Sequence, residues 1–117
     1  MTNSILKLKS YDFALRTVKL FRYLADEKRE FVLSKQILRS GTSIGANIEE
    51  AYQGESKADF IHKLAIANKE AFETHYWLRL LRDSGYLEER FAESLLSDCS
   101  ELQKLLVSTI KTIKSKS

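Results

Sequence analysis

Residues 56–85 read SKADFIHKLAIANKEAFETHYWLRLLRDSG. Within them, apolar or small side chains recur at alternating spacings of four and three, the period of one buried helical face. The row consists of Phe60, Leu64, Ala67, Ala71, Thr74, Leu78 and Leu81. Ser56 and Asp59 form a variant of the capping box at the start, and Gly85 suits the left-handed residue that commonly ends a helix. The stretch predicts one helix over 57–84.

Three further amphipathic patterns accompany this helix along the chain. They predict helices over about 10–26, 32–52 and 88–114, with Ser10 as the N-cap of the first. In that first helix we expect the buried row to be Tyr11, Ala14, Val18, Phe21 and Ala25. Spacings that average about 3.5 residues imply a left-handed supercoil, and short connections make successive helices antiparallel neighbours. The sequence therefore predicts an all-α fold, an antiparallel up-down-up-down four-helix bundle that forms a single domain over residues 1–117.

Composition supports long helices and excludes several classes of protein. The 117 residues include no proline and only four glycines, which disfavours an all-β fold. No apolar run approaches the about 20 residues that span a membrane, and the first residues lack the apolar stretch of a signal peptide. A lone cysteine, Cys99, allows neither an internal disulfide nor a cysteine-based zinc site. We therefore expect a cytoplasmic protein with no membrane partner.

Apolar residues also lie outside the expected core rows of the first and last helices. Five of them are candidates for a subunit interface: Phe13, Leu20, Leu24, Phe91 and Leu105. A lone bundle needs one apolar face per helix, so wider apolar faces favour burial against another subunit. The alternative is a broad core-facing stripe in a compact monomer. Of the two, self-association is the interpretation that we favour.

Positive charge gathers at the two ends of the chain. The net charge is +3, yet residues 1–25 and 104–117 each carry +4, and the acidic middle carries −5. An antiparallel bundle of four helices brings both ends to the same pole. Candidate contacts to RNA or DNA are therefore Lys7, Lys9, Arg16, Lys19, Lys111, Lys114 and Lys116. Two interpretations stay open: lysines that complement a helix dipole and solvate a frayed tail, or an anion-binding pole.

Residues 36–50, QILRSGTSIGANIEE, are the segment least typical of a helix. Each mid-helix glycine costs about 1 kcal/mol relative to alanine, so we expect a neighbouring helix to approach closely here. The polar residues of this segment form one stripe, and the 57–84 helix has a second. The combined candidate network is Gln36, Arg39, Ser43, Asn47, Glu50, Glu70, Glu73 and Trp77. We interpret it as a structural lock, with two alternatives: recognition of an outside ligand, and acid–base chemistry or metal binding at Glu70 and Glu73.

The sequence lacks the residue patterns of common catalytic and metal sites. A di-iron centre in a helical bundle needs two Glu-x-x-His pairs, but His62 follows Asp59 at that spacing and His75 follows Phe72. Both histidines are expected to face solvent or an interface. The sequence contains no glycine-rich phosphate loop and no nucleophile elbow. We therefore predict no enzymatic activity, no catalytic residue, no metal, no cofactor and no small-molecule substrate.

The central segments of the chain resemble a known family. Residues 36–51 and 56–81 are similar to the bacterial four-helix bundle family named after proteins encoded in intervening sequences of 23S ribosomal RNA genes. The matching positions are Gln36, Arg39, Ser43, Ile44, Asn47, Ile48 and Glu50 in the family's Q-x-x-R-[AS]-x-x-S-I-x-x-N-I-x-E core, with Glu70 and Glu73 as its acidic positions. The resemblance implies a non-enzymatic, cytoplasmic bundle that assembles as a ring-like homopentamer and whose cellular role is undefined.

A related branch sharpens one of two functional hypotheses. The accessory variability proteins of diversity-generating retroelements, a branch related to the family that this chain resembles, are basic pentamers that engage nucleic acid and a reverse transcriptase. The first hypothesis is a homo-oligomeric interaction or scaffold protein. The second is weak RNA or DNA binding without sequence specificity, through a basic pole that assembly would repeat around a ring.

Overall fold

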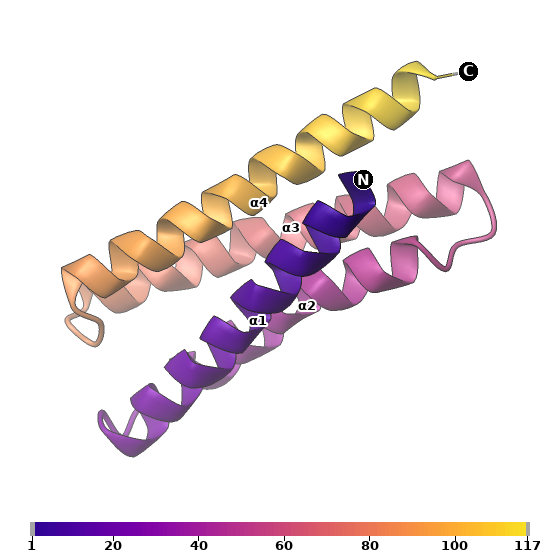
Figure 1. Ribbon diagram of the computed structural model, residues 1–117. Helices are drawn as coiled ribbons and strands as arrows, with labels where there is room; N and C mark the ends of the chain where they lie inside the picture. Colours follow the sequence, from indigo (N-terminus) through magenta and orange to yellow (C-terminus); the bar gives the residue numbers. More distant parts are fainter. Residues whose placement is uncertain (1, 117) are drawn as a thin grey trace.

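Four helices joined by short connections make up the fold. The computed structural model describes residues 2–116, with side chains from residue 5 onward. The helices are α1 (Thr2–Asp26), α2 (Leu33–Ala51), α3 (Lys57–Asp83) and α4 (Glu89–Ser115), and the described residues include no strand. The bundle measures 50 × 21 × 20 Å, and the start of α1, the α2–α3 connection and the end of α4 share one end (Figure 1). The predicted all-α, antiparallel four-helix bundle is confirmed.

Each helix packs against two of the others. α1 contacts α2 and α4, and α3 contacts the same two helices, so α1 and α3 occupy diagonal corners of the bundle. Leucines and isoleucines from every helix meet in a single core, including Leu24, Ile44, Leu78 and Leu106, all of which are fully buried. This continuous core is what positions the polar and apolar surfaces described below.

The start of α1 differs from the prediction. The helix begins at Thr2 rather than near residue 10, and Ser10 is not an N-cap. Ser10 is buried within the helix, and its hydroxyl donates to the carbonyl of Lys7 at 3.2 Å. The buried Leu6 continues the core row one turn before Ser10. Ser10, a small polar residue on the core face, therefore produced the sequence pattern of an N-cap although no helix begins there.

The core-facing row of α1 is the one that we had assigned to a subunit interface. Phe13, Leu20 and Leu24 are at most 7% exposed and pack inside the single chain. Tyr11, which was expected in the core, is exposed instead. The other members of the expected row, Ala14, Val18, Phe21 and Ala25, are half-buried. Both rows repeat every three to four residues, so periodicity alone could not decide which of them faces inward.

The caps of the other helices combine predicted and unpredicted features. The Ser56 hydroxyl accepts from the backbone N–H of Asp59 at 3.1 Å, and Gly85 has a φ of +87°, as the sequence indicated. At the start of α2, the carboxylate of Glu30 accepts from the backbone N–H groups of Val32, Leu33 and Ser34 at 3.2, 3.0 and 2.7 Å. A carboxylate that takes three otherwise unpaired donors of the first turn stabilises the helix start.

The close approach expected in the 36–50 segment occurs at Gly41. A Cβ atom at this position would lie 2.6 Å from Cγ2 and 2.7 Å from Oγ1 of Thr17 on α1. Thr17 is buried and its hydroxyl donates to the carbonyl of Phe13 at 2.9 Å, so it cannot move aside easily. The glycine is therefore required by the crossing of α1 over α2.

Candidate functional site

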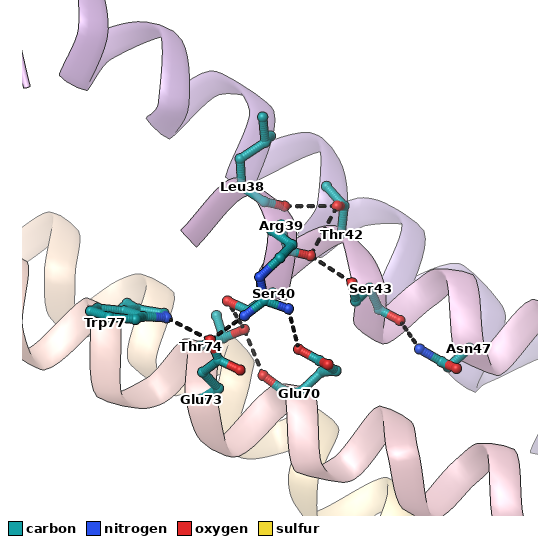
Figure 2. Close-up of polar contacts among 10 residues, drawn as sticks. All are labelled: Leu38, Arg39, Ser40, Thr42, Ser43, Asn47, Glu70, Glu73, Thr74 and Trp77. Atoms are coloured by element: carbon teal, nitrogen blue, oxygen red, sulfur yellow. Dashed lines mark hydrogen bonds and ion pairs between the residues drawn. The ribbon is translucent and has the colours of Figure 1, made fainter. Parts of the chain in front are cut away.

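A cluster of charged residues joins α2 to α3. Arg39 on α2 donates to Glu70 at 3.2 Å and to Glu73, and both carboxylates come from α3 (Figure 2). The indole N–H of Trp77 donates to the same Glu73 carboxylate at 3.0 Å. Residues 70, 73 and 77 lie on one face of α3 because they are spaced by three and four, which brings both carboxylates to Arg39 and Trp77 to Glu73. The sequence placed Arg39, Glu70, Glu73 and Trp77 in one polar network, and in the structure these four side chains form one cluster.

The electrostatics of the cluster favour its charged form. The hydrogen bond from Arg39 lowers the pKa of Glu73 and outweighs the opposing effect of partial burial, and the Trp77 bond adds to the lowering. The pKa of Arg39 is raised, mainly by its hydrogen bond to Glu73. The Arg39 side chain is 49% exposed, so the cluster lies at the surface edge of the α2–α3 contact and not in the core. Both carboxylates of the cluster therefore have the Arg39 guanidinium as an ion-pair partner.

The remaining residues of the predicted network separate from this cluster. Ser43 donates to the carbonyl of Arg39 at 2.7 Å, and Asn47 donates to the carbonyl of Ser43 at 2.9 Å, so both serve their own helix (Figure 2). Glu50 pairs with Lys63 at 2.8 Å, which makes a second α2–α3 ion pair. Gln36 is exposed and has no side-chain hydrogen bond within the described part of the chain.

A buried hydroxyl pair was missed by sequence reasoning. Thr74 on α3 donates to the hydroxyl of Ser40 on α2 at 2.9 Å, and it lies 2.8 Å from the carbonyl oxygen of Glu70. Both side chains are fully buried. The available signal was one hydroxyl residue in the apolar row of each helix, because a polar group in a core row needs a partner. The α2–α3 seam, defined here as Ser40–Thr74 and the ion pairs beside it, is thus polar in its interior as well as at its edge.

The predicted basic residues divide into two groups. Lys9 pairs with Glu101 at 3.3 Å and Arg16 pairs with Asp98 at 2.7 Å, so α4 neutralises both of these α1 cations. Lys19 lines a groove near the opposite end of the bundle from the chain termini. The set that remains at the end shared by the termini is Lys7, Lys111, Lys114 and Lys116.

Aromatic residues and a further lysine, Lys57, lie at the same end of the bundle. The Lys7 ammonium is 5.0 Å from the centroid of the Tyr52 ring, and Tyr52 meets Phe60 edge to face with centroids 5.0 Å apart. Lys57, at the start of α3, donates to the carbonyl of Lys116. We name Lys7, Lys57, Lys111, Lys114 and Lys116 the basic end of the bundle.

Two of the predicted interface residues remain outside the core. Phe91 is 60% exposed and borders a groove of about 400 Å³ between α1 and α4, together with Tyr23 and Leu87. Leu105 is half-buried and packs against the core. Of the five expected interface residues, Phe91 alone keeps a largely free side chain.

A row of exposed apolar residues on α1 was not predicted. Ile5, Leu8, Tyr11 and Leu15 are between 45% and 63% exposed. With 100° of rotation per residue, they lie on the side of α1 opposite Phe13 and Leu24. α1 is therefore apolar on two opposite faces, one of which packs in the core. The spacing of this row could have been recognised, but the core row on the opposite face of α1 has the same period.

Cys99 and His75, two side chains of types that often perform catalysis, have shifted pKa values and partners within the chain. Burial, with a smaller contribution from Asp98, raises the pKa of Cys99 to about 12, and the thiol donates to the carbonyl of Ala71 at 3.2 Å. His75 accepts from Arg79 at 3.1 Å, and burial together with the nearby arginines lowers its pKa. Residues 2–116 contain no group of three or more side chains suited to hold a metal ion. No helix in that range is long and apolar enough to cross a membrane.

Comparison with protein-family models decides the family. Residues 2–108 match the model described as 23S rRNA-intervening sequence protein. The chain belongs to this family. Among solved structures, a protein of unknown function from the S23 ribosomal protein family of Bacteroides thetaiotaomicron, determined at 1.70 Å, is 56% identical to this 23S rRNA-intervening sequence family member. The match covers 95% of this chain and 99% of the other, with a TM-score of 0.94. No curated protein matches the chain.

Proposed function

We propose that this member of the 23S rRNA-intervening sequence family is a non-enzymatic, homo-oligomeric bundle that acts as an interaction or scaffold protein. The observation that carries the proposal is the second apolar face of α1, where Ile5, Leu8, Tyr11 and Leu15 are all about half exposed. Large apolar patches on a protein surface mark contacts with a partner, and most assemblies of soluble proteins are symmetric homo-oligomers. The ring of five copies that the family resemblance implies is the assembly that we expect.

The α2–α3 seam supports the non-enzymatic part of the proposal. Its charges pair within the chain, its buried hydroxyls satisfy each other, and Trp77 covers Glu73. A seam with complete partners is suited to hold two helices together, and offers neither a nucleophile nor a free acid–base pair to a substrate.

Native mass measurement at micromolar concentration tests the proposal. After nuclease treatment we expect a multiple of 13.5 kDa, with five copies as the predicted multiple. Leu8→Glu, on the exposed apolar face of α1, should lower this mass, because a carboxylate in an apolar contact loses hydration. Ala46→Glu is the matched control, since Ala46 is exposed on the outer side of α2. A wild-type mass of one chain at this concentration would refute the oligomer.

A second candidate function is weak, sequence-independent binding of RNA or DNA by the basic end. What supports it is the gathering of Lys7, Lys57 and Lys116 beside the aromatic pair Tyr52 and Phe60. Repetition of this end around an oligomer would multiply a modest charge, and phosphate contacts would make the affinity depend on salt.

Salt titration of single-stranded RNA binding tests this second candidate. Affinity should fall steeply between low and moderate salt, and the triple change of Lys111, Lys114 and Lys116 to Glu should abolish it. Changing Lys9 and Arg16, which α4 already neutralises, should have the smaller effect. Binding that is insensitive to salt, or that survives the triple change, would exclude the basic end as the contact.

A further inference from the structure

The exposed apolar residues of α1 form a continuous ridge. We name Ile5, Leu8, Tyr11 and Leu15 the α1 ridge; at 1.5 Å per residue they extend over about 15 Å of helix. Asp12, also exposed, is adjacent to the ridge and places a carboxylate beside it. A partner surface for this ridge therefore needs an apolar floor of similar length and at least one cation.

A groove between α3 and α4 has these properties. Its volume is about 650 Å³, and Phe72 of α3 and Val107 of α4, 63% and 44% exposed, supply its apolar surface. Lys104 and Lys111 line the same groove. It follows α4 from Ser100 to Thr112, which is about 18 Å of helix. We name it the α3/α4 groove.

We propose that the α1 ridge of one copy packs into the α3/α4 groove of the next copy, with Asp12 facing Lys104 and Lys111. The inference rests on the proposed homo-oligomer and names the two surfaces that would build it. Apolar burial supplies the attraction, and the complementary charges fix the direction of approach. Each chain therefore carries both surfaces of the contact, the α1 ridge and the α3/α4 groove.

The positions of the two surfaces specify the kind of symmetry. The ridge belongs to α1, whereas α4 and Phe72 of α3 line the groove, so the two surfaces are formed by different helices. Contact between two different surfaces is heterologous, and it propagates from copy to copy until it closes into a ring or extends as a filament. A simple two-fold dimer through one shared patch does not use both surfaces in this way.

The positions of the ridge and the groove along the bundle axis favour closure into a ring. The ion pairs Lys9–Glu101 and Arg16–Asp98 place the ridge segment of α1 beside residues 98–101 of α4, where the groove begins. Ridge and groove therefore overlap along the bundle axis, and successive copies need little displacement along it. Without a rise, successive copies stay in one plane, and they form a ring when the rotation between neighbours closes.

The groove between α1 and α4 fits the ridge less well. It is lined by Tyr23, Leu87 and Phe91, near the end of the bundle away from the chain termini. Seating the ridge there would shift each copy along the bundle axis, which builds an open filament. Its charged lining is mixed, with Glu88 beside Arg16 and Lys19, so the two grooves differ in their position along the axis and not in charge.

A mixing experiment with two variants tests the inference. Leu8→Glu damages the ridge and leaves the groove intact, whereas Val107→Glu damages the groove and leaves the ridge intact. Each variant alone should have the mass of one chain, and circular dichroism should show an unchanged helix content. An equimolar mixture should form a two-chain complex that grows no further, because the pair retains one undamaged ridge facing one undamaged groove.

The charge component has a separate test. Asp12→Lys should weaken assembly of the otherwise unchanged chain by about fivefold, which is the upper range for an exposed ion pair. Adding Lys104→Asp and Lys111→Asp to the same chain should restore the lost affinity. Weakening without restoration would show that Asp12 faces something other than these lysines and would overturn the proposed approach.

The outcomes separate this inference from the proposed function. A wild-type protein with the mass of one chain would remove both. A wild-type oligomer that survives Val107→Glu, or a mixture that stays monomeric, would overturn the ridge-and-groove contact alone. Phe72→Glu provides the same test should Val107→Glu fail to fold. Loss of assembly in Phe91→Glu, with Val107→Glu unaffected, would assign the ridge to the groove between α1 and α4.

Discussion

The α2–α3 seam and helix α1 use their side chains in opposite ways. At the seam, Arg39 meets two carboxylates and the buried Ser40 and Thr74 hydroxyls meet each other, all within one chain. α1 holds α4 through two ion pairs and buries Leu24, yet it leaves Leu8 and its neighbours on the opposite face uncovered. The polar side chains of the seam find their partners within a single molecule, whereas the apolar residues on one face of α1 remain uncovered. This difference separates the part of the sequence that maintains the fold from the part that we expect to meet another copy.

The largest difference in stability is expected between substitutions on the two faces of α1. Leu24→Ala should reduce the free energy of unfolding by about 2–5 kcal/mol, because it opens a cavity at a fully buried position. Leu8→Ala should change it by less than about 0.5 kcal/mol when the chain is dilute enough to be monomeric. Urea unfolding at several protein concentrations measures both values. Equal losses for the two variants in the monomer would contradict the assignment of the faces.

Because α1 crosses α2 closely at Gly41, replacing Gly41 and Gly45 by alanine should change the stability of the fold differently. Gly41→Ala should destabilise by about 1 kcal/mol, since overpacking against Thr17 outweighs the gain in helix propensity. At Gly45 a new Cβ would lie 3.4 Å from Ser10, an ordinary contact, so Gly45→Ala should be neutral or stabilising by up to about 1 kcal/mol. The thermal unfolding temperatures of the two variants measure this difference. Thr17→Ala should relieve the cost of Gly41→Ala, and an unrelieved cost would mean that the two residues do not clash.

The contribution of Glu30 to the stability of the start of α2 should depend on pH. Burial alone would raise the pKa of Glu30, but its hydrogen bonds from Leu33, Ser34 and Val32 outweigh this effect and lower it. Glu30→Ala should cost about 1 kcal/mol at neutral pH. Because the folded-state pKa is depressed, this contribution is present above the ordinary glutamate pKa and is lost as pH falls through the lowered value. Chemical denaturation across this range should show wild type and variant converging in acid; a constant gap would exclude the carboxylate cap.

The smallest effect is expected at the exposed edge of the seam. Glu73→Gln should cost less than about 1 kcal/mol, because Arg39 is half exposed and solvent weakens the pair. Trp77 is the chain's single tryptophan and donates to Glu73, so its fluorescence should report the change. The signal should also titrate at a pH below the ordinary glutamate pKa, since Arg39 lowers the pKa of Glu73. Glu49→Gln on the exposed side of α2 is the control and should leave the fluorescence unaltered.

Much of the fold could be read from particular residues. The bounds of α2, α3 and α4 lie within a residue or so of the prediction, because Ser56 and Gly85 mark two of the ends by local backbone chemistry. α1 could not be placed so well. Its buried Ser10 resembled a cap, and two rows with the same period competed for the core. Periodicity describes one helix at a time, whereas the choice of the inward face depends on all four.

The polar residues show a similar division. The sequence placed Arg39 on one polar stripe and Glu70 and Glu73 on another, and the structure pairs Arg39 with both carboxylates. Gln36 shares the stripe but faces solvent, and Glu30, which lies between the first two predicted helices, caps α2. Such roles depend on where the chain turns, which spacing within a helix does not specify.

Hydroxyl-radical labelling of the wild-type protein tests the central claim most directly. In a single chain Tyr11 and Val32 are 62% and 70% exposed, so both should react readily if nothing covers them. At micromolar concentration we predict that the peptide with Leu8, Tyr11 and Leu15 is protected while the peptide with Val32 is labelled, and that dilution removes the protection. Labelling of both peptides in proportion to their single-chain exposure at every concentration would contradict an α1 face covered by a second copy.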